Sequence, residues 1–255
     1  MKRITSETNP AYRRWLRLAT QPRAVRELGT TLAEGAHLAE AVFAAGVPVQ
    51  AALVRAGSGN EALLARVPVD AATVELPAPL FDRLGLVERG IGFALVITVP
   101  AEQGTTARGD LLYLDSVQEP GNAGALLRVA AAAGVGDVWA GPGTAALWSP
   151  KVLRAAQGAH FALRLRENVG PDQLQSQFKG ALIATAMLDA VSLWQAELPS
   201  SPVAWLLGSE GQGLAQPLLQ AADLRVKIPI AAGVESLNVA SAAAVCLFER
   251  RRRLG

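Results

Sequence analysis

From residue 110 onward, short apolar runs alternate with amphipathic segments. The runs have the length of buried strands and lie at residues 110–116, 137–140, 161–165, 182–186, 203–207 and 224–228. Between and after them, the spacing of apolar positions predicts helices at 122–133, 151–157, 172–179, 216–221 and 238–253. Buried strands separated by helices are typical of a mostly parallel sheet covered on both faces. The pattern therefore predicts an α/β fold.

The first hundred residues show a shorter version of the same alternation. A strand and then a helix are predicted over 24–45, strands at 47–54, 72–76 and 93–99, and short helices at 60–66 and 79–86. The stretch 101–110 is polar, contains glycine and lacks apolar periodicity. We therefore expect two domains, at 1–100 and 111–255, joined by a linker at 101–110.

Composition narrows the class of protein. With 51% apolar and 18% charged residues, the chain is too apolar to be disordered. Cys246 is the single cysteine, and only His37 and His160 accompany it, so neither an intrachain disulfide nor a metal centre is expected. No apolar run reaches the roughly 18 residues of a spanning helix, and the N-terminus lacks the apolar stretch of a secretory signal. We therefore expect a cytoplasmic protein that does not enter a membrane.

Positive charge gathers near the N-terminus, although the net charge is only +2. Residues 1–30 contain seven basic side chains, Lys2, Arg3, Arg13, Arg14, Arg17, Arg23 and Arg26. Tyr12 and Trp15 lie among them and are candidates to stack on nucleic-acid bases. The alternative is an ordinary amphipathic helix with a solvated basic face. The charge pattern permits an RNA partner without requiring one.

Three segments of the second half carry candidate chemistry, and the first is DSVQEPGNAGALLR at 115–128. It follows a predicted strand and opens a predicted helix. Pro120 and Gly121 predict a sharp turn, and Asn122 is the expected N-cap of the helix. Arg128 is the one charge in that helix. Taken alone, it fits a solvated arginine that extends from a helix face.

The other two segments are LLGSEGQGL at 206–214 and IPIAAGVESLNVA at 228–240. In the first, glycines at the end of a strand would let a ligand approach the backbone closely, and Glu210 adds a carboxylate. In the second, Pro229 ends a strand and either Ser236 or Asn238 caps the last helix. Neither has the glycine spacing of a dinucleotide fingerprint or a P-loop. The three segments would form a ligand pocket if they converge.

In order, residue types and spacing, these segments resemble motifs 1, 2 and 3 of the SpoU (TrmH-like) RNA 2′-O-ribose methyltransferases of the SPOUT superfamily. The segment SPKVLRAAQG at 149–158 is also similar to this family. The first hundred residues resemble the family's substrate-binding domain through Glu34-Gly35-Ala36-His37, but Glu88-Arg89 replaces the polar residues usual before Gly90. The resemblance implies a small N-terminal α/β domain like some ribosomal proteins and a C-terminal α/β SPOUT domain with a trefoil knot.

The resemblance also implies an activity: transfer of a methyl group from S-adenosylmethionine, without a metal, to a ribose 2′-hydroxyl of structured RNA, with rRNA preferred to tRNA. The positions that match the cosubstrate site are Leu207, Gly208, Ile228, Ile230, Leu237 and Ala240. Those that match the catalytic positions are Arg128, Asn122, Glu210, Ser236 and Asn238. A guanidinium holds its proton too tightly to be a good base, so we expect Arg128 to bind phosphate and stabilise the developing alkoxide.

The family forms homodimers, and the last helix offers an apolar stripe for such an interface, composed of Val239, Ala242, Ala243, Cys246 and Leu247. Two other functions remain as alternatives. One is a catalytically inactive RNA-binding protein that keeps the fold. The other is a nucleotide-binding α/β enzyme of another reaction type, which does not explain why all three motifs occur in order.

Overall fold

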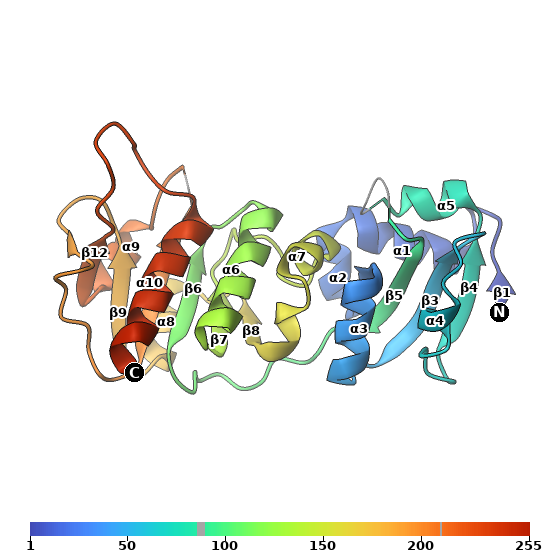
Figure 1. Ribbon diagram of the computed structural model, residues 1–255, viewed down its shortest axis with the longest axis horizontal. Helices are drawn as coiled ribbons and strands as arrows, with labels where there is room; N and C mark the ends of the chain where they lie inside the picture. The colour runs from blue at the N-terminus through green and yellow to red at the C-terminus, as the bar shows by residue number, and fades with distance from the viewer. Residues whose placement is uncertain (86–89, 210) are drawn as a thin grey trace. The chain divides into compact units, whose positions relative to one another are not determined.

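The computed structural model describes residues 1–85, 90–209 and 211–255 (Figure 1). The chain divides into two compact units, one formed by Met1–Ala101 with Trp148–Phe161 and the other by Glu102–Leu147 with Ala162–Gly255. The sequence-based division at 101–110 does not anticipate the excursion of 148–161 into the first unit. Residues 148–161 belong to the first unit through contacts with residues distant in the sequence, and the spacing of apolar residues does not reveal such contacts.

The first unit is built on a five-stranded sheet with the order β1-β4-β3-β5-β2. Its strands are β1 (Lys2–Arg3), β2 (Thr30–Glu34), β3 (Val49–Arg55), β4 (Ala72–Leu76) and β5 (Phe93–Thr98). Strand β5 runs antiparallel to β2 and β3, and the other pairs are parallel. Its helices are α1 (Pro10–Thr20), α2 (Pro22–Leu28), α3 (Ala36–Ala45), α4 (Glu61–Leu64), α5 (Ala78–Arg83) and α7 (Pro150–Ala156).

Helix α1 overturns one expectation. Tyr12 and Trp15 are buried, and the Tyr12 hydroxyl donates a hydrogen bond of 3.1 Å to the carbonyl of Leu80. Both aromatic rings therefore belong to the core and are not available to stack on bases. The alternative, an amphipathic helix whose basic side chains face solvent, is confirmed. The start of the strand predicted over 24–45 is also wrong, because α2 continues to Leu28.

The second unit is built on a seven-stranded sheet with the order β10-β12-β9-β11-β6-β7-β8, in which every pair is parallel. Its strands are β6 (Leu111–Asp115), β7 (Asp137–Ala140), β8 (Arg164–Glu167), β9 (Ala181–Thr185), β10 (Val191–Ser192), β11 (Val203–Gly208) and β12 (Leu224–Lys227). Its α-helices are α6 (Pro120–Ala133), α8 (Pro171–Gln177), α9 (Gln216–Ala221) and α10 (Val239–Leu254). The predicted parallel sheet is confirmed.

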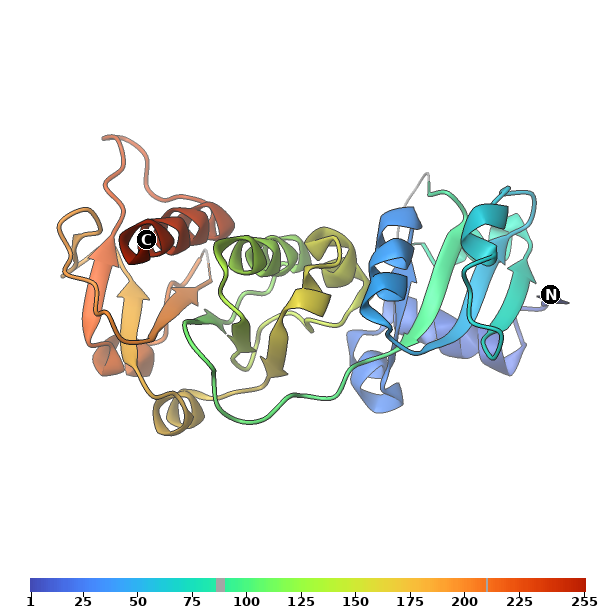
Figure 2. The ribbon, with the colours of Figure 1, turned by 60° about the horizontal axis from the view of Figure 1, so that its bottom comes forward.

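Helices cover both faces of this sheet. Figure 2 shows α6 and α10 along one face and α8 and α9 along the other. Alternate side chains of the strands, such as Tyr113 and Leu206, pack with Leu174 and Leu218 of the second helix pair. Most of the apolar stripe on α10 is buried within one chain, where α10 packs on α6, so the stripe adds nothing to the dimer that the family resemblance implies.

Two further segments differ from the predicted pattern. A 3₁₀-helix at Ala159–Ala162 occupies the start of the strand expected at 161–165, which begins instead at Arg164. Within the expected linker, the N–H of Arg108 donates to the Asp137 carboxylate at 2.9 Å. Part of the expected linker is therefore fixed to the second unit. The contact is polar, so the apolar pattern of the sequence gives no sign of it. Among the described residues, no helix is long and apolar enough to span a membrane.

Candidate functional site

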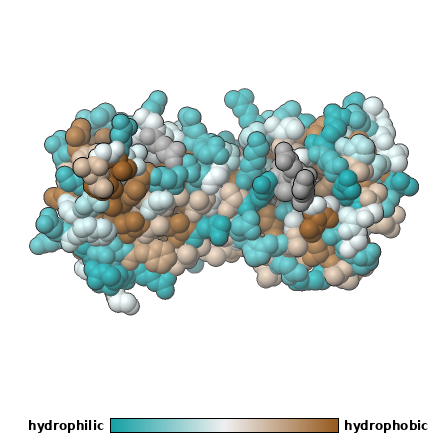
Figure 3. All heavy atoms as spheres, turned by 45° about the horizontal axis from the view of Figure 1, so that its top comes forward, coloured by the Kyte–Doolittle hydropathy of each residue, from teal (hydrophilic) through white to brown (hydrophobic). Residues whose placement is uncertain are grey.

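The loops that follow β9, β11 and β12 meet at the carboxyl edge of the seven-stranded sheet and enclose a cavity of about 570 Å³. This volume lies within the range of about 300–1,000 Å³ that is usual for small-molecule sites. With this edge turned forward, hydrophobic atoms gather over the end of the second unit that holds β9 and β12 (Figure 3). The carboxyl edge of a parallel sheet is where α/β proteins bind ligands.

Five of the six predicted cosubstrate positions line this large cavity, namely Leu207, Gly208, Ile228, Ile230 and Leu237. Ser236, which was predicted as catalytic, lines it too. The sixth cosubstrate position, Ala240, lies in the first turn of α10, is nearly buried and is not among the lining residues. The segments 206–214 and 228–240 therefore converge on one cavity.

Gly208 is required by the packing of the chain on itself. A Cβ atom at this position would lie 2.1 Å from the main-chain carbonyl carbon of Gly213. The loop between them closes through a bond of 2.9 Å from the N–H of Gly213 to the carbonyl of Ser209. The expectation that this glycine leaves room for a ligand is therefore incomplete, because the loop's own backbone takes that space.

The segment at 115–128 contributes a second, smaller cavity of about 300 Å³. Its lining residues are Val117, Gln118, Glu119 and Asn122 from this segment, with Ser209, Gly211, Gln212 and Val239. Three of these, Ser209, Gln212 and Val239, also line the large cavity. The two cavities therefore adjoin, and all three predicted segments meet at this edge.

Asn122 and Asn238 join the first and third segments. The N-cap of α6 is Glu119, so the prediction that Asn122 caps this helix is wrong. Asn122 lies instead in the first turn, where its Oδ1 accepts a hydrogen bond of 2.9 Å from Nδ2 of Asn238. Oδ1 of Asn238 accepts from the N–H groups of Ala240 and Ser241, as predicted for the cap of α10. One amide thus caps a helix and links two segments.

Arg128 lies apart from this group. It is six residues beyond Asn122 on α6, which places it about 9 Å further along the axis. Its side chain is exposed, lines neither cavity, and makes no salt bridge to any carboxylate in the described part of the chain. Glu210, and Glu88 with Arg89 of the first unit, lie outside the described residues.

Sequence reasoning missed the loop after β9, where residues 185–189 line the large cavity together with Gln212, Gln216 and Arg225. Thr185 ends β9, and its hydroxyl donates to the carbonyl of Leu206 at 3.2 Å. The apolar run of β9 was visible, but its place beside β11 depends on strand order, which the sequence does not display. Among the described residues, no group of three or more His, Cys, Asp or Glu side chains could hold a metal ion.

Comparison with known proteins gives a consistent result. Residues 110–248 match a family model described as the SpoU rRNA Methylase family. A curated relative, 23S rRNA (guanosine(2553)-2'-O)-methyltransferase RlmP of Bacillus subtilis, is 33% identical over 256 residues, which is 98% of this chain and 100% of the relative.

Two solved structures resemble the whole chain. A putative RNA methyltransferase of the TrmH family from Porphyromonas gingivalis is 32% identical with a TM-score of 0.81, covering 97% of this chain and 100% of its own. An AdoMet-bound rRNA methyltransferase from Sinorhizobium meliloti is 25% identical with a TM-score of 0.85, covering 100% of this chain and 98% of its own. Similarity at this coverage includes both units and not only the sheet that carries the cavities.

Proposed function

This chain belongs to the SpoU rRNA methylase family, and we propose that it transfers a methyl group from S-adenosylmethionine to a ribose 2′-hydroxyl of ribosomal RNA. The observation that carries the proposal is the convergence of the three motif segments on two adjoining cavities at the carboxyl edge of the parallel sheet. In the reaction, the 2′-oxygen forms a bond to the methyl carbon while the carbon–sulfur bond breaks; S-adenosylhomocysteine leaves as the neutral thioether, and the hydroxyl proton passes to solvent.

The large cavity is the proposed site of S-adenosylmethionine. Its lining combines apolar side chains, such as Leu207, Ile228 and Leu237, with four residues of the glycine-containing loop, Gly208, Ser209, Gln212 and Gly213. Such a lining suits an adenine ring held between apolar groups and recognised by main-chain amides. The positive sulfonium is already an activated leaving group, so we propose a reaction that needs no metal ion.

The catalytic roles are assigned on the family pattern. Asn122 and Asn238 would fix the first and third segments around the ribose, because their side chains are hydrogen-bonded to each other. Ser236, in the lining of the large cavity, and Glu210 would position the reacting groups. Arg128 would bind an RNA phosphate and stabilise negative charge on the 2′-oxygen, a role that suits an exposed guanidinium.

We propose a guanosine of 23S rRNA as the class of target, because the full-length relative from Bacillus subtilis is named for that activity. In the first unit, Arg13, Arg14 and Arg23 are exposed on α1 and α2, and no described carboxylate lies within salt-bridge distance of them. They are the proposed contacts to RNA phosphate. Their joint replacement by alanine should weaken RNA binding and flatten its salt dependence. Arg83→Ala, which removes an arginine already paired with Glu7, should change little.

The same family membership leads us to propose a homodimer, a trefoil knot in the second unit, and a cytoplasmic location. Trp194 and Phe248 are large apolar side chains that stay half exposed on this unit, and a second copy would cover them. Light scattering should therefore give twice the chain mass of 26.6 kDa. A mass of one chain at working concentration would contradict the dimer.

Calorimetry with S-adenosylmethionine, followed by methyl transfer to ribosomal RNA, tests the proposed function. We expect saturable binding of the cosubstrate that a chelator leaves unchanged, and a methyl group mapped to one ribose of 23S rRNA. Binding of RNA without methyl transfer would favour the inactive RNA-binding alternative. Failure to bind the cosubstrate would contradict the proposal itself.

A further inference from the structure

Asp115 contacts both ends of the loop between Gly208 and Ala215, which contributes residues to the lining of the large cavity. As the last residue of β6, it is the ladder partner of Gly208, the residue from which the loop departs. Its carboxylate accepts a hydrogen bond of 2.7 Å from the N–H of Ala215, the residue to which the loop returns. Asp115 itself is only 8% exposed and lines neither cavity.

Packing also holds the two ends of this loop in place. Gly208 lies so close to Gly213 that no Cβ fits between them, and Leu214 is anchored in the core. Ser209, Gln212, Gly213 and Leu214 all line the large cavity. A movement of the loop at Ala215 would therefore move this wall of the cavity.

We propose that Asp115 is a positioning residue for S-adenosylmethionine, which holds Ser209 and residues 212–214 where they can bind the cosubstrate; this inference rests on the proposed function. A loop that is already ordered does not lose conformational entropy when the ligand binds. Without the carboxylate, only a fraction of the molecules has the wall in place, and the apparent affinity falls by that fraction. The chemical step, which takes place after the cosubstrate has bound, is largely spared.

Asp115→Ala and Asp115→Asn separate this role from general damage to the fold. Asp115→Ala removes the acceptor, and we expect the Kd for S-adenosylmethionine to rise about tenfold, as for loss of one charge-assisted hydrogen bond. The kcat at saturating cosubstrate should stay within about threefold. Asp115→Asn keeps an acceptor oxygen and should restore most of the affinity. Thr144→Val is the matched control, because its hydroxyl bonds the carbonyl of the neighbouring Leu114 and does not contact the loop.

Ala215→Pro tests the same hydrogen bond from the donor side. Ala215 has a φ of −60°, which proline adopts, and the substitution removes its N–H. We expect a similar loss of affinity, and no further loss when it is combined with Asp115→Ala, because both changes delete one bond. If Asp115→Ala does not fold, the affinity of Ala215→Pro decides the question.

Hydrogen exchange across 209–215 provides a readout that does not depend on activity. Exchange should accelerate in Asp115→Ala and in Ala215→Pro, and should be unchanged in Thr144→Val. Wild-type affinity in the alanine variant, or losses that add in the double variant, would overturn the proposal. Failure of the wild-type protein to bind S-adenosylmethionine would instead overturn the proposed function.

Discussion

The two edges of the seven-stranded sheet use their polar residues differently. At the amino edge, aspartates at the start of β6, β7 and β12 each accept a main-chain N–H from another segment; the pairs are Asp110 with Val203, Asp137 with Arg108, and Asp223 with Leu182. At the carboxyl edge lie the two cavities that the motif segments line, with Ser236 and Gln212 in their linings. A further cavity of about 380 Å³ borders Asp110 and Arg250 at the amino edge, and no motif segment lines it. Asp115 holds the N–H of Ala215 at the carboxyl edge in the same way, but there the segment that it holds lines a cavity shared by the motif segments.

Buried ion pairs reinforce the amino edge. Arg250 of α10 is 4% exposed, forms two hydrogen bonds with Asp110, and donates to the carbonyls of Pro199 and Ser201. Arg164 pairs with Asp137 in the same way beside β7. Such pairs add little net stability when formed, but breaking one leaves a buried charge unpaired. Mutations at this edge should therefore act on stability, and mutations at the other edge on activity.

The largest effect is expected from Arg250→Ala. Removing the guanidinium leaves Asp110 with the N–H of Val203 but without its positive partner, and leaves two carbonyls without a donor, which should lower the free energy of unfolding by about 3–5 kcal/mol. Urea unfolding measures this loss. Arg251→Ala is the control, because Arg251 is exposed and donates to the carbonyl of Ala132, and it should cost at most about 1 kcal/mol. Equal losses in the two variants would contradict the anchoring role of the amino edge.

Arg128→Ala should lower the rate of methyl transfer and leave stability unchanged. We expect methyl transfer to slow by about 10²–10³-fold, as for other groups that stabilise developing charge, with unchanged unfolding and cosubstrate affinity. Arg128→Lys should not restore the full rate, because the lysine ammonium cannot form the two parallel hydrogen bonds with which a planar guanidinium binds phosphate. Single-turnover kinetics measures both. Wild-type rates in Arg128→Ala would show that the side chain is an ordinary solvated arginine.

The contrast between the edges also explains what the sequence could predict. The parallel sheet and the two cavity-lining loops follow from apolar runs that end in glycine, proline or capping residues, as at Gly208 and Asn238. The aspartates of the amino edge give no such pattern, because each acts on a backbone group far away in the sequence. Asp110, for example, bonds Val203, which lies 93 residues further along the chain.

The site shows the same limit. The match at Asn122 identified a residue of the smaller cavity, but local turn chemistry gave it the wrong structural role, because Glu119 caps the helix one turn earlier. Residues 185–189 were missed because their loop borders the cavity only through the strand order β12-β9-β11. Tyr12 and Trp15 were misread because charge pattern alone does not show which face of α1 is buried.

Asn238 both caps α10 and donates a hydrogen bond to Asn122, and two substitutions should separate its effect on stability from its effect on activity. Asn238→Ala removes the cap of α10 and should cost about 1 kcal/mol of unfolding free energy. Asn238→Ser keeps a capping oxygen but loses the amide that donates to Asn122. We expect it to unfold within about 0.5 kcal/mol of wild type and yet to methylate RNA more slowly. Wild-type activity in this variant would show that the Asn122–Asn238 bond only supports the fold.

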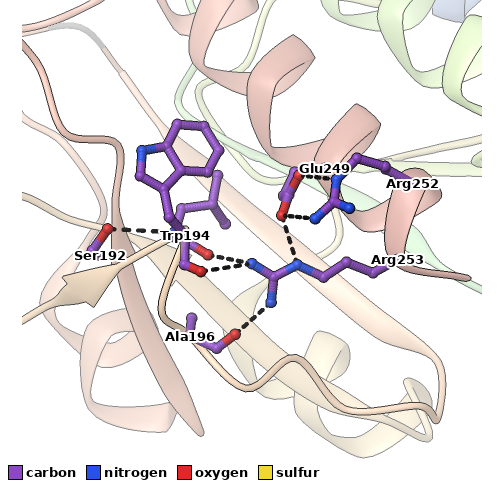
Figure 4. A network of polar contacts seen from close by, with 7 residues as sticks. Ser192, Trp194, Ala196, Glu249, Arg252 and Arg253 are labelled. Atoms are coloured by element: carbon purple, nitrogen blue, oxygen red, sulfur yellow. Dashed lines mark hydrogen bonds and ion pairs between the residues drawn. The ribbon is translucent and has the colours of Figure 1, made fainter.

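The smallest effect is expected at Glu249, which lies near the same end of α10 as Arg250 and pairs with Arg252, whose side chain is 70% exposed, and with Arg253. Hydrogen bonds from Arg252 and Arg253 lower the pKa of Glu249 to about 2 (Figure 4). Because this pKa is depressed in the folded state, the two ion pairs stabilise the fold fully above pH 4.5, the ordinary pKa of the group. This stabilisation disappears as the pH falls towards about 2. Glu249→Gln should therefore lower the Tm slightly at neutral pH, and the difference should vanish in acid.

The effect at Glu249 should be small because Arg253 also donates to the carbonyl of Ala196 (Figure 4) and to that of Leu193, and both bonds remain when the carboxylate is removed. The pair with the exposed Arg252 is in addition screened by water and salt. Thermal melts of both proteins between pH 2 and 7, with an NMR titration of the Glu249 carboxyl, measure the two parts of the prediction. A loss as large as that of Arg250→Ala would mean that position at the amino edge, and not burial of the arginine, determines the strength of these ion pairs.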